Sequence, residues 1–148
     1  MFYAKYDAMD VAEYILWYCE NELKRPISNL QLQKILYYVQ GEYLATHDEP
    51  LFDNKIEAWA YGPVVPDVYY SFNKFRSREI KGVIPERRLL FEDDELELIQ
   101  GVVRERSSID VWDLVSQTHE TSPWQDNYIE GRNMEISNWD IKDYFNNN

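Results

Sequence analysis

The chain has 148 residues, a formal net charge of -12 and a single cysteine, Cys19. One cysteine excludes an internal disulfide, and no stretch is typical of a signal peptide or a membrane-spanning helix. The excess of carboxylates repels nucleic acid and anionic lipid, so we expect a cytoplasmic protein with no nucleic-acid or membrane partner and with a cationic protein partner. Solubility alone is the alternative explanation of the charge. The length suits a single domain over residues 1–148.

The first helix is predicted over 10–23, with Asp7 or Asp10 at its start. Trp17 falls outside the apolar stripe of this helix, and Tyr14 lies at the edge of the same sector. Because that sector is otherwise acidic, the aromatic pair is a candidate binding site for a partner. The alternative is that Trp17 packs against a chain terminus or a later helix.

The second helix is predicted over 28–45 and is apolar on most of its circumference, which is typical of a helix with neighbours on both sides. Ser28 and Gln31 have the spacing of a capping box. Gly41 weakens a helix, so we expect another backbone to approach closely there. Tyr37 lies off the main apolar face and is a second candidate for partner binding. This helix is the predicted centre of the fold.

Turn-forming residues predict a loop over 46–54, and alternating side chains predict a short strand over 55–61 that ends at Gly62. Pro66 is suited to the first turn of the next helix. Tyr70 points away from the apolar stripe of that helix and is a third candidate for partner binding. The stripe itself consists of Val65, Val68, Tyr69, Phe72 and Phe75.

Residues 76–91 mix charge with turn formers, and a second short strand is one interpretation of them. A helix is predicted from Asp93 or Asp94, with Arg104 and Arg106 near its end, where cations suit the helix dipole. Capping signals predict three more helices, at Ser107 with Asp110, Ser122 with Pro123, and Ser137 with Asp140. The apolar residues of the first and last of these are Val111, Trp112, Leu114 and Val115, and Trp139, Ile141, Tyr144 and Phe145. The predicted fold is mainly α, a compact helical domain of about six or seven helices around 28–45, with a small β element near 55–61.

Candidate catalytic and metal-binding residues are few. His47, His119 and Cys19 cannot complete a closed Cys/His zinc site, so we predict no metal and no cofactor. Capping or hydrogen bonding is the favoured role for His119, and a hydrolase centred on it is the enzymatic alternative. Basic residues cluster only at Arg87–Arg88 and at Arg104 with Arg106, which argues against a regulator that binds nucleic acid.

Three segments in order, LQLQKILYYVQGEYLA, PLFDNKIEAWAYGPVVPDVY and THETSPW, followed by a last helix ending in YF, resemble the Panacea antitoxin domain family, which is SocA-like and phage-associated. The order and spacing are specific, especially Leu36-Tyr37-Tyr38, then Ala58-Trp59, then Gly62-Pro63-Val64. The resemblance covers nearly the whole chain, apart from 76–91.

The resemblance implies a mainly helical antitoxin that is not an enzyme and that binds a toxin encoded beside it. Members of the family neutralise toxins of unrelated folds, and one SocA-like relative delivers its toxin to a protease instead. We therefore expect neutralisation of a basic toxin by direct binding; a protease adaptor and a phage-associated regulatory protein are the alternatives. The residues expected to bind the partner are Tyr14, Trp17, Tyr37 and Tyr70. Neither the toxin, the stoichiometry nor self-association follows from the sequence.

Overall fold

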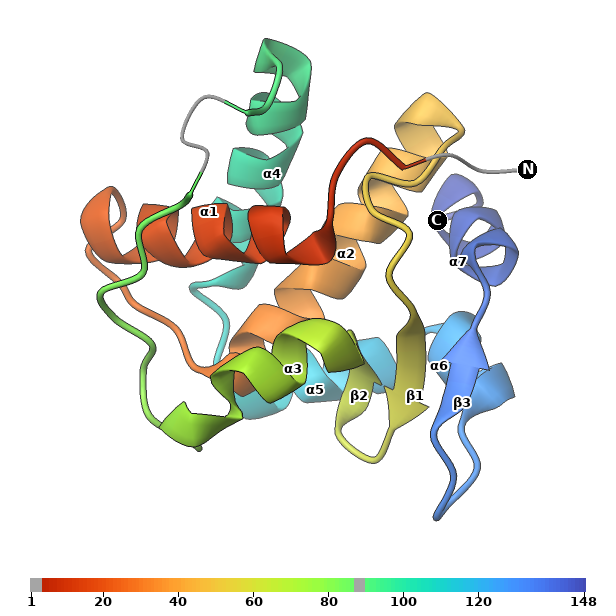
Figure 1. The fold of residues 1–148 in the computed structure, drawn as a ribbon. Coiled ribbons are helices and arrows are strands. Elements are labelled where there is room, and N and C mark those ends of the chain that lie inside the picture. The colour runs from red at the N-terminus through yellow and green to blue at the C-terminus, as the bar shows by residue number, and fades with distance from the viewer. Residues whose placement is uncertain (1–3, 87–89) are drawn as a thin grey trace.

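The structure is a computed structural model that describes residues 4–86 and 90–148 (Figure 1). The described residues form seven α-helices, one short 3-10 helix and a three-stranded sheet, which confirms the mainly helical fold. The helices are α1 (Ala8–Asn21), α2 (Asn29–His47), α3 (Pro66–Phe72), η1 (Asn73–Phe75), α4 (Asp93–Arg106), α5 (Val111–His119), α6 (Ser122–Asn127) and α7 (Asn138–Asn146). The strands are β1 (Ile56–Trp59), β2 (Gly62–Val64) and β3 (Met134–Ile136).

Helix α2 runs through the middle of the molecule and packs against α1, α4, α5 and α7 (Figure 1). Its start is the predicted capping box, in which Ser28 and Gln31 each accept a backbone N–H. Apolar side chains are buried on both sides of the helix, and so are the polar residues Gln33, Lys34 and Gln40. The predicted central helix is therefore confirmed, and its continuous burial follows from having neighbours all round.

Gly41 lets α7 lie close against α2. A Cβ atom built at Gly41 would overlap the ring of Phe145, so only a residue without a side chain fits there. The sequence predicted that another backbone approaches Gly41 closely. A close approach is present, but the approaching group is the Phe145 side chain and not a backbone. The Phe145 ring also meets Tyr37 and Tyr38 edge to face, at centroid distances of 5.6 and 5.9 Å.

The sheet has the order β2-β1-β3, and both pairings are antiparallel. β1 lies within the predicted strand at 55–61. Gly62 does not end the β element as expected, because it pairs with Trp59 and begins β2, with a φ of 109° that suits glycine. β3 was not predicted, since a run of three residues is too short for its alternation of apolar and polar side chains to indicate a strand. The described part of 76–91 contains no strand, and only an isolated bridge joins Glu79 to Ser28.

The last three helices begin close to the predicted positions, but two of them have a different cap. Asp110 caps α5, whereas Ser107 ends α4 and accepts a hydrogen bond from Arg25. Thr121, and not Ser122, precedes α6. Ser137 caps α7 as predicted. Trp112 lies on the exposed face of α5, which corrects its assignment to the buried stripe.

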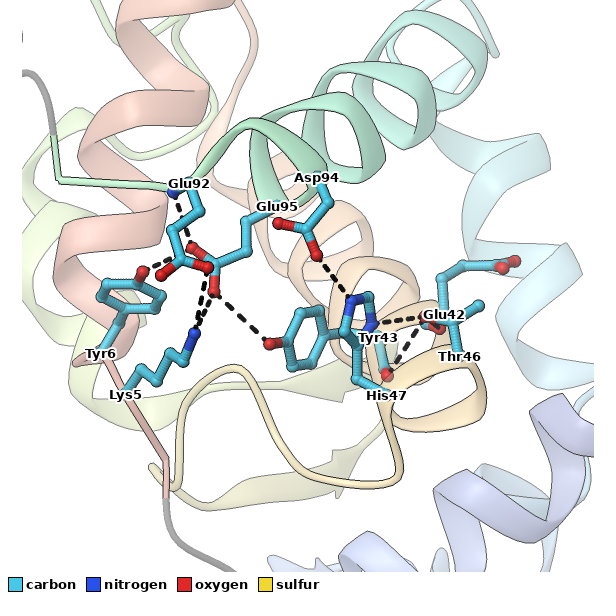
Figure 2. Close-up of polar contacts among 9 residues, drawn as sticks. All are labelled: Lys5, Tyr6, Glu42, Tyr43, Thr46, His47, Glu92, Asp94 and Glu95. Carbon is cyan, nitrogen blue, oxygen red and sulfur yellow. Dashed lines mark hydrogen bonds and ion pairs between the residues drawn. The ribbon is translucent and has the colours of Figure 1, made fainter.

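A buried carboxylate ties the segment before α1 to α4 and α2 (Figure 2). Glu95 accepts hydrogen bonds from the Lys5 ammonium at 3.1 Å, the Tyr43 hydroxyl at 3.4 Å, the Glu92 backbone N–H and the Tyr6 hydroxyl. Burial alone would raise the pKa of Glu95, but the donors, with Tyr6 the strongest, hold that pKa below its usual value. The cluster is an internally satisfied clamp for the N-terminal segment.

None of the helices in the described part of the chain is both long and apolar enough to cross a membrane.

Candidate partner-binding site

Two of the four predicted partner-binding residues lie inside the core. Tyr37 is 0% exposed, and its hydroxyl forms a 2.8 Å hydrogen bond with the Thr121 hydroxyl. Tyr14 is 8% exposed, accepts a 2.7 Å hydrogen bond from Gln100 and packs beside Phe91. Other helices cover both rings, since α7 packs against α2 and α4 packs against α1, and this burial disfavours the predicted role of the two residues in partner binding.

Trp17 is half-buried and packs against the core. It borders a shallow hollow of about 290 Å³ shared with Gly82, Val83 and Ile84, which belong to a later loop. The sequence left open packing of Trp17 against a chain terminus or a later helix, whereas the neighbours it has in this hollow belong to a loop. Its role in partner binding stays a prediction.

Tyr70 is 60% exposed, and its ring lies beside those of Trp59 and Tyr69 in a group of aromatic side chains at the surface. These rings surround a groove of about 360 Å³, which we call the aromatic groove, between the β1–β2 turn, α3, η1 and the starts of α2 and α5. Tyr70 itself is not a lining residue but stands beside Trp59 at a centroid distance of 6.0 Å. The groove is lined by Asn29, Leu30, Gln33, Trp59, Ala60, Tyr61, Val64, Tyr69, Arg76, Ser77 and Trp112.

One wall of the groove is Trp59 with Tyr69, whose rings meet edge to face at 5.0 Å. The indole N–H of Trp59 donates to the Glu57 carboxylate at 2.9 Å, and the Asn29 side chain donates to the Tyr69 carbonyl at 3.1 Å. The first bond orients the Trp59 indole within β1, and the second ties α3 to the start of α2. This wall is therefore built before any partner arrives.

The other wall is formed by Tyr61 and Trp112, which are 58% and 54% exposed and meet edge to face at 5.4 Å. Large aromatic rings are enriched at the centres of protein interfaces, and adjacent exposed rings mark such surfaces. Sequence reasoning missed both residues, because it put Trp112 on a buried stripe and treated Tyr61 as part of a strand. The signal that could have found Tyr61 is its place in the turn, directly before Gly62.

The β1–β2 turn beneath Tyr61 rests on a buried lysine. Lys34 is 0% exposed, and its ammonium donates to the Pro63 carbonyl at 2.6 Å. A Cβ atom at Gly62 would lie 2.6 Å from the Thr118 hydroxyl and 2.8 Å from Lys34 Cε, so the turn is pressed closely onto α2 and α5. Burial lowers the pKa of Lys34 to about 7, and no described carboxylate forms an ion pair with it.

His119 is a packing residue in this structure. Its ring stacks on Trp124 at 3.9 Å, and its buried Nε2 has no hydrogen-bond partner among the described residues. Burial lowers the pKa of His119, an effect that the Ala60 backbone partly opposes. The Trp124 N–H donates to the Trp59 carbonyl at 2.8 Å, so this stack supports β1 from below the groove.

The described residues contain no group of three or more His, Cys, Asp or Glu side chains that could hold a metal ion. Of the basic residues considered for nucleic-acid binding, Arg104 donates to the Tyr18 hydroxyl and Arg106 stacks on Tyr38 at 3.8 Å. Arg87 and Arg88 lie outside the described residues.

Comparison with known proteins identifies the family. The family model for the SocA-like antitoxin with a Panacea domain matches residues 32–125, which is more than half of the chain and includes most of the aromatic groove. The antitoxin SocA of Caulobacter vibrioides (strain NA1000 / CB15N) is 50% identical over 48 residues, which is 32% of this chain and 26% of that relative. The match thus spans about a quarter of the relative's length. No solved structure matches the chain. The chain belongs to the SocA-like, Panacea-domain antitoxin family.

Proposed function

We propose that this protein is an antitoxin that binds its toxin directly, through the aromatic groove. Membership of an antitoxin family supports the class of function. The observation that carries the choice of surface is the pair of exposed rings, Tyr61 and Trp112, facing a preformed wall of Trp59 and Tyr69. Binding, and not catalysis, is the activity that such a surface supplies.

We further propose that the toxin is basic and is encoded beside this chain. The net charge of -12 supports a cationic partner. Exposed carboxylates flank the groove in sequence, with Asp67 three residues before Tyr70 and Asp110 and Asp113 on either side of Trp112. An apolar centre within an acidic surround suits a partner whose own apolar patch is bordered by lysine or arginine.

The test is growth rescue when this chain is co-expressed with the protein of the adjacent reading frame. We expect Trp112→Ala and Tyr61→Ala each to lose neutralisation and at least about tenfold in affinity, as is common for exposed aromatic residues at the centre of an interface. Their melting temperatures should stay near that of the parent, because both side chains are more than half exposed.

Trp139→Ala is the matched control, since this exposed tryptophan lies on α7, away from the groove lining. It should rescue growth as well as the parent does. Trp17→Ala tests the other predicted surface. If the two groove variants neutralise normally and Trp17→Ala does not, toxin binding takes place at α1 and the groove assignment is wrong.

A further inference from the structure

Among the described residues that line the aromatic groove, Arg76 is the only one that carries a charge. Its side chain has no hydrogen bond, ion pair or ring contact with the described residues, and only its backbone N–H is bonded, to the Asn73 carbonyl. The residue follows η1 with a φ of 56° and a ψ of -121°, a conformation that non-glycine residues rarely adopt. The exposed Arg76 side chain thus borders an apolar groove and has no internal partner among the described residues.

Three other arginines are engaged internally. Arg25 donates to Ser107, Arg104 donates to Tyr18, and Arg106 donates to Gln117 while stacking on a tyrosine ring. The chain has 27 acidic and only 15 basic residues, so carboxylates outnumber the cations that could pair with them. An arginine side chain without a carboxylate partner is therefore unexpected. The planar fork of arginine matches a carboxylate in two parallel hydrogen bonds, and such bonds strengthen beside apolar walls that exclude water.

We propose that the aromatic groove takes a segment of the partner that inserts one apolar ring between the walls and sets a carboxylate against Arg76. This rests on the proposed function, since the segment belongs to the toxin. The groove volume of about 360 Å³ is at the lower end of the range for ligand sites and suits one aromatic side chain with its flanking backbone. The carboxylate comes from an Asp or Glu side chain or from a chain terminus.

A carboxylate anchor is compatible with a basic toxin, because the two charges act at different ranges. The overall negative charge attracts a cationic protein over a Debye length, which is about 8 Å at physiological ionic strength. Arg76 acts only on contact and selects which segment of that protein enters the groove. A partner with a basic surface and one exposed acidic and aromatic segment would satisfy both requirements.

The first test uses small probes and needs no toxin. Indole-3-propionate carries an aromatic ring and a carboxylate, whereas tryptamine carries the same ring and an ammonium. We expect indole-3-propionate to shift the indole N–H resonances of Trp59 and Trp112 in nuclear magnetic resonance spectra, with a dissociation constant on the order of 1 mM. Tryptamine should bind at least about fivefold more weakly, because it meets Arg76 with a like charge.

The variants are Arg76→Gln and its matched control Arg78→Gln, which removes the same charge two residues away. Arg78 lies over the Phe75 ring and does not line the groove. Indole-3-propionate should lose at least about fivefold in affinity with Arg76→Gln and keep its affinity with Arg78→Gln. Arg76→Lys, which keeps the charge but not the fork, should be intermediate. Tryptamine binding as tightly as indole-3-propionate, or equal loss in both Gln variants, would overturn the proposal.

A second test uses the toxin and separates this proposal from the proposed function. Toxin affinity should fall at least about tenfold with Arg76→Gln and stay unchanged with Arg78→Gln. Toxin binding that needs Trp112 but tolerates Arg76→Gln would refute the carboxylate anchor and leave the antitoxin function standing. Extending the toxin beyond its last residue moves the terminal carboxylate away, and comparing this change with replacement of its Asp and Glu residues one at a time distinguishes the two sources of the carboxylate.

Discussion

Lys34 is a buried cation with a single described acceptor, the Pro63 carbonyl. Burial without a carboxylate partner disfavours the charged form, which is why the pKa of Lys34 falls from its usual 10.5 to about 7. Between these two values the unfolded chain binds a proton at Lys34 that the folded chain does not. Lys34 therefore destabilises the fold increasingly as the pH falls from about 10.5 to about 7, and the full penalty is present below that range.

We expect Lys34→Met to raise the free energy of unfolding by about 1 to 3 kcal/mol at pH 6, because methionine fills similar space without a buried charge. The advantage over the parent should shrink as the pH rises from about 7 toward about 10.5, because the lysine of the unfolded parent then also loses its proton and the penalty disappears. Urea denaturation of both proteins at several pH values measures the difference. A variant that is less stable than the parent at pH 6 would show that the bond to Pro63 outweighs the cost of burial.

At the scale of single elements, the position of α7 against α2 depends on the contact between Gly41 and the Phe145 ring. Alanine normally favours a helix over glycine by about 1 kcal/mol. Here we expect Gly41→Ala to lower the free energy of unfolding by about 1 to 3 kcal/mol, since the new methyl group overlaps the ring and α7 must shift. The check is a pair of thermal melts.

The same substitution in a Phe145→Ala background supplies the control for this prediction. With the ring removed, Gly41→Ala should become neutral or stabilising, because only its helix propensity remains. If Gly41→Ala costs the same in both backgrounds, another neighbour of Gly41 is responsible.

The N-terminal segment depends on the Glu95 clamp of Figure 2. Because the folded-state pKa of Glu95 is lowered, its charge contributes stability above the usual glutamate pKa, and this contribution is lost as the pH falls through the lowered folded-state value. Glu95→Gln should cost about 2 to 4 kcal/mol at pH 7, through weakened bonds from Lys5 and Tyr6.

The difference between Glu95→Gln and the parent should narrow as the pH falls through the lowered folded-state pKa of Glu95, because the parent carboxylate is then protonated. Hydrogen exchange should show faster exchange at Tyr6, whose backbone N–H donates to Leu51. Glu97→Gln, on the exposed face of the same helix, is the control and should change little. A difference in stability that stays constant as the pH is lowered through the titration of Glu95 would mean that shape, and not charge, is what Glu95 provides.

At the scale of the whole molecule, the net charge of -12 should increase the rate at which this protein associates with a cationic toxin. We expect the association rate constant to fall at least about tenfold between about 50 mM and 500 mM salt, while the dissociation rate changes little. Stopped-flow fluorescence measures both rates. Trp112→Ala should show the opposite pattern, with faster dissociation and an unchanged salt dependence of association, and rates that stay flat with salt would contradict electrostatic steering.

Local signals in the sequence predicted most of the helices. The capping box of Ser28 and Gln31 involves only four consecutive residues, so the start of α2 could be predicted from the local sequence. The cap at Ser137 could be predicted in the same way. Exposure is set by contacts between distant segments. Tyr37 is buried because Phe145 and Thr121 reach it, and neither is adjacent in sequence.

The aromatic groove illustrates the same limit. It forms where Trp59, Tyr69 and Trp112 converge from a strand and two helices, and only the fold brings these rings together. Helical periodicity placed Trp112 on the apolar side of a nine-residue helix, too short for the pattern to separate core from surface. Of the four residues predicted to bind a partner, Tyr70 is the one that the structure sets beside the groove.

The packing of α7 against α2 affects the order in which the protein can mature during translation. α2 is synthesised early, yet one flank of it stays uncovered until residues 138–146 have left the ribosome. The sheet is also incomplete until late in translation, because β3, at residues 134–136, pairs with β1. A nascent chain therefore exposes apolar surface that chaperones recognise, and the finished fold is reached only after nearly all of the described chain has been made. A gene order that places this chain ahead of its toxin would allow the antitoxin to finish folding before the toxin is made.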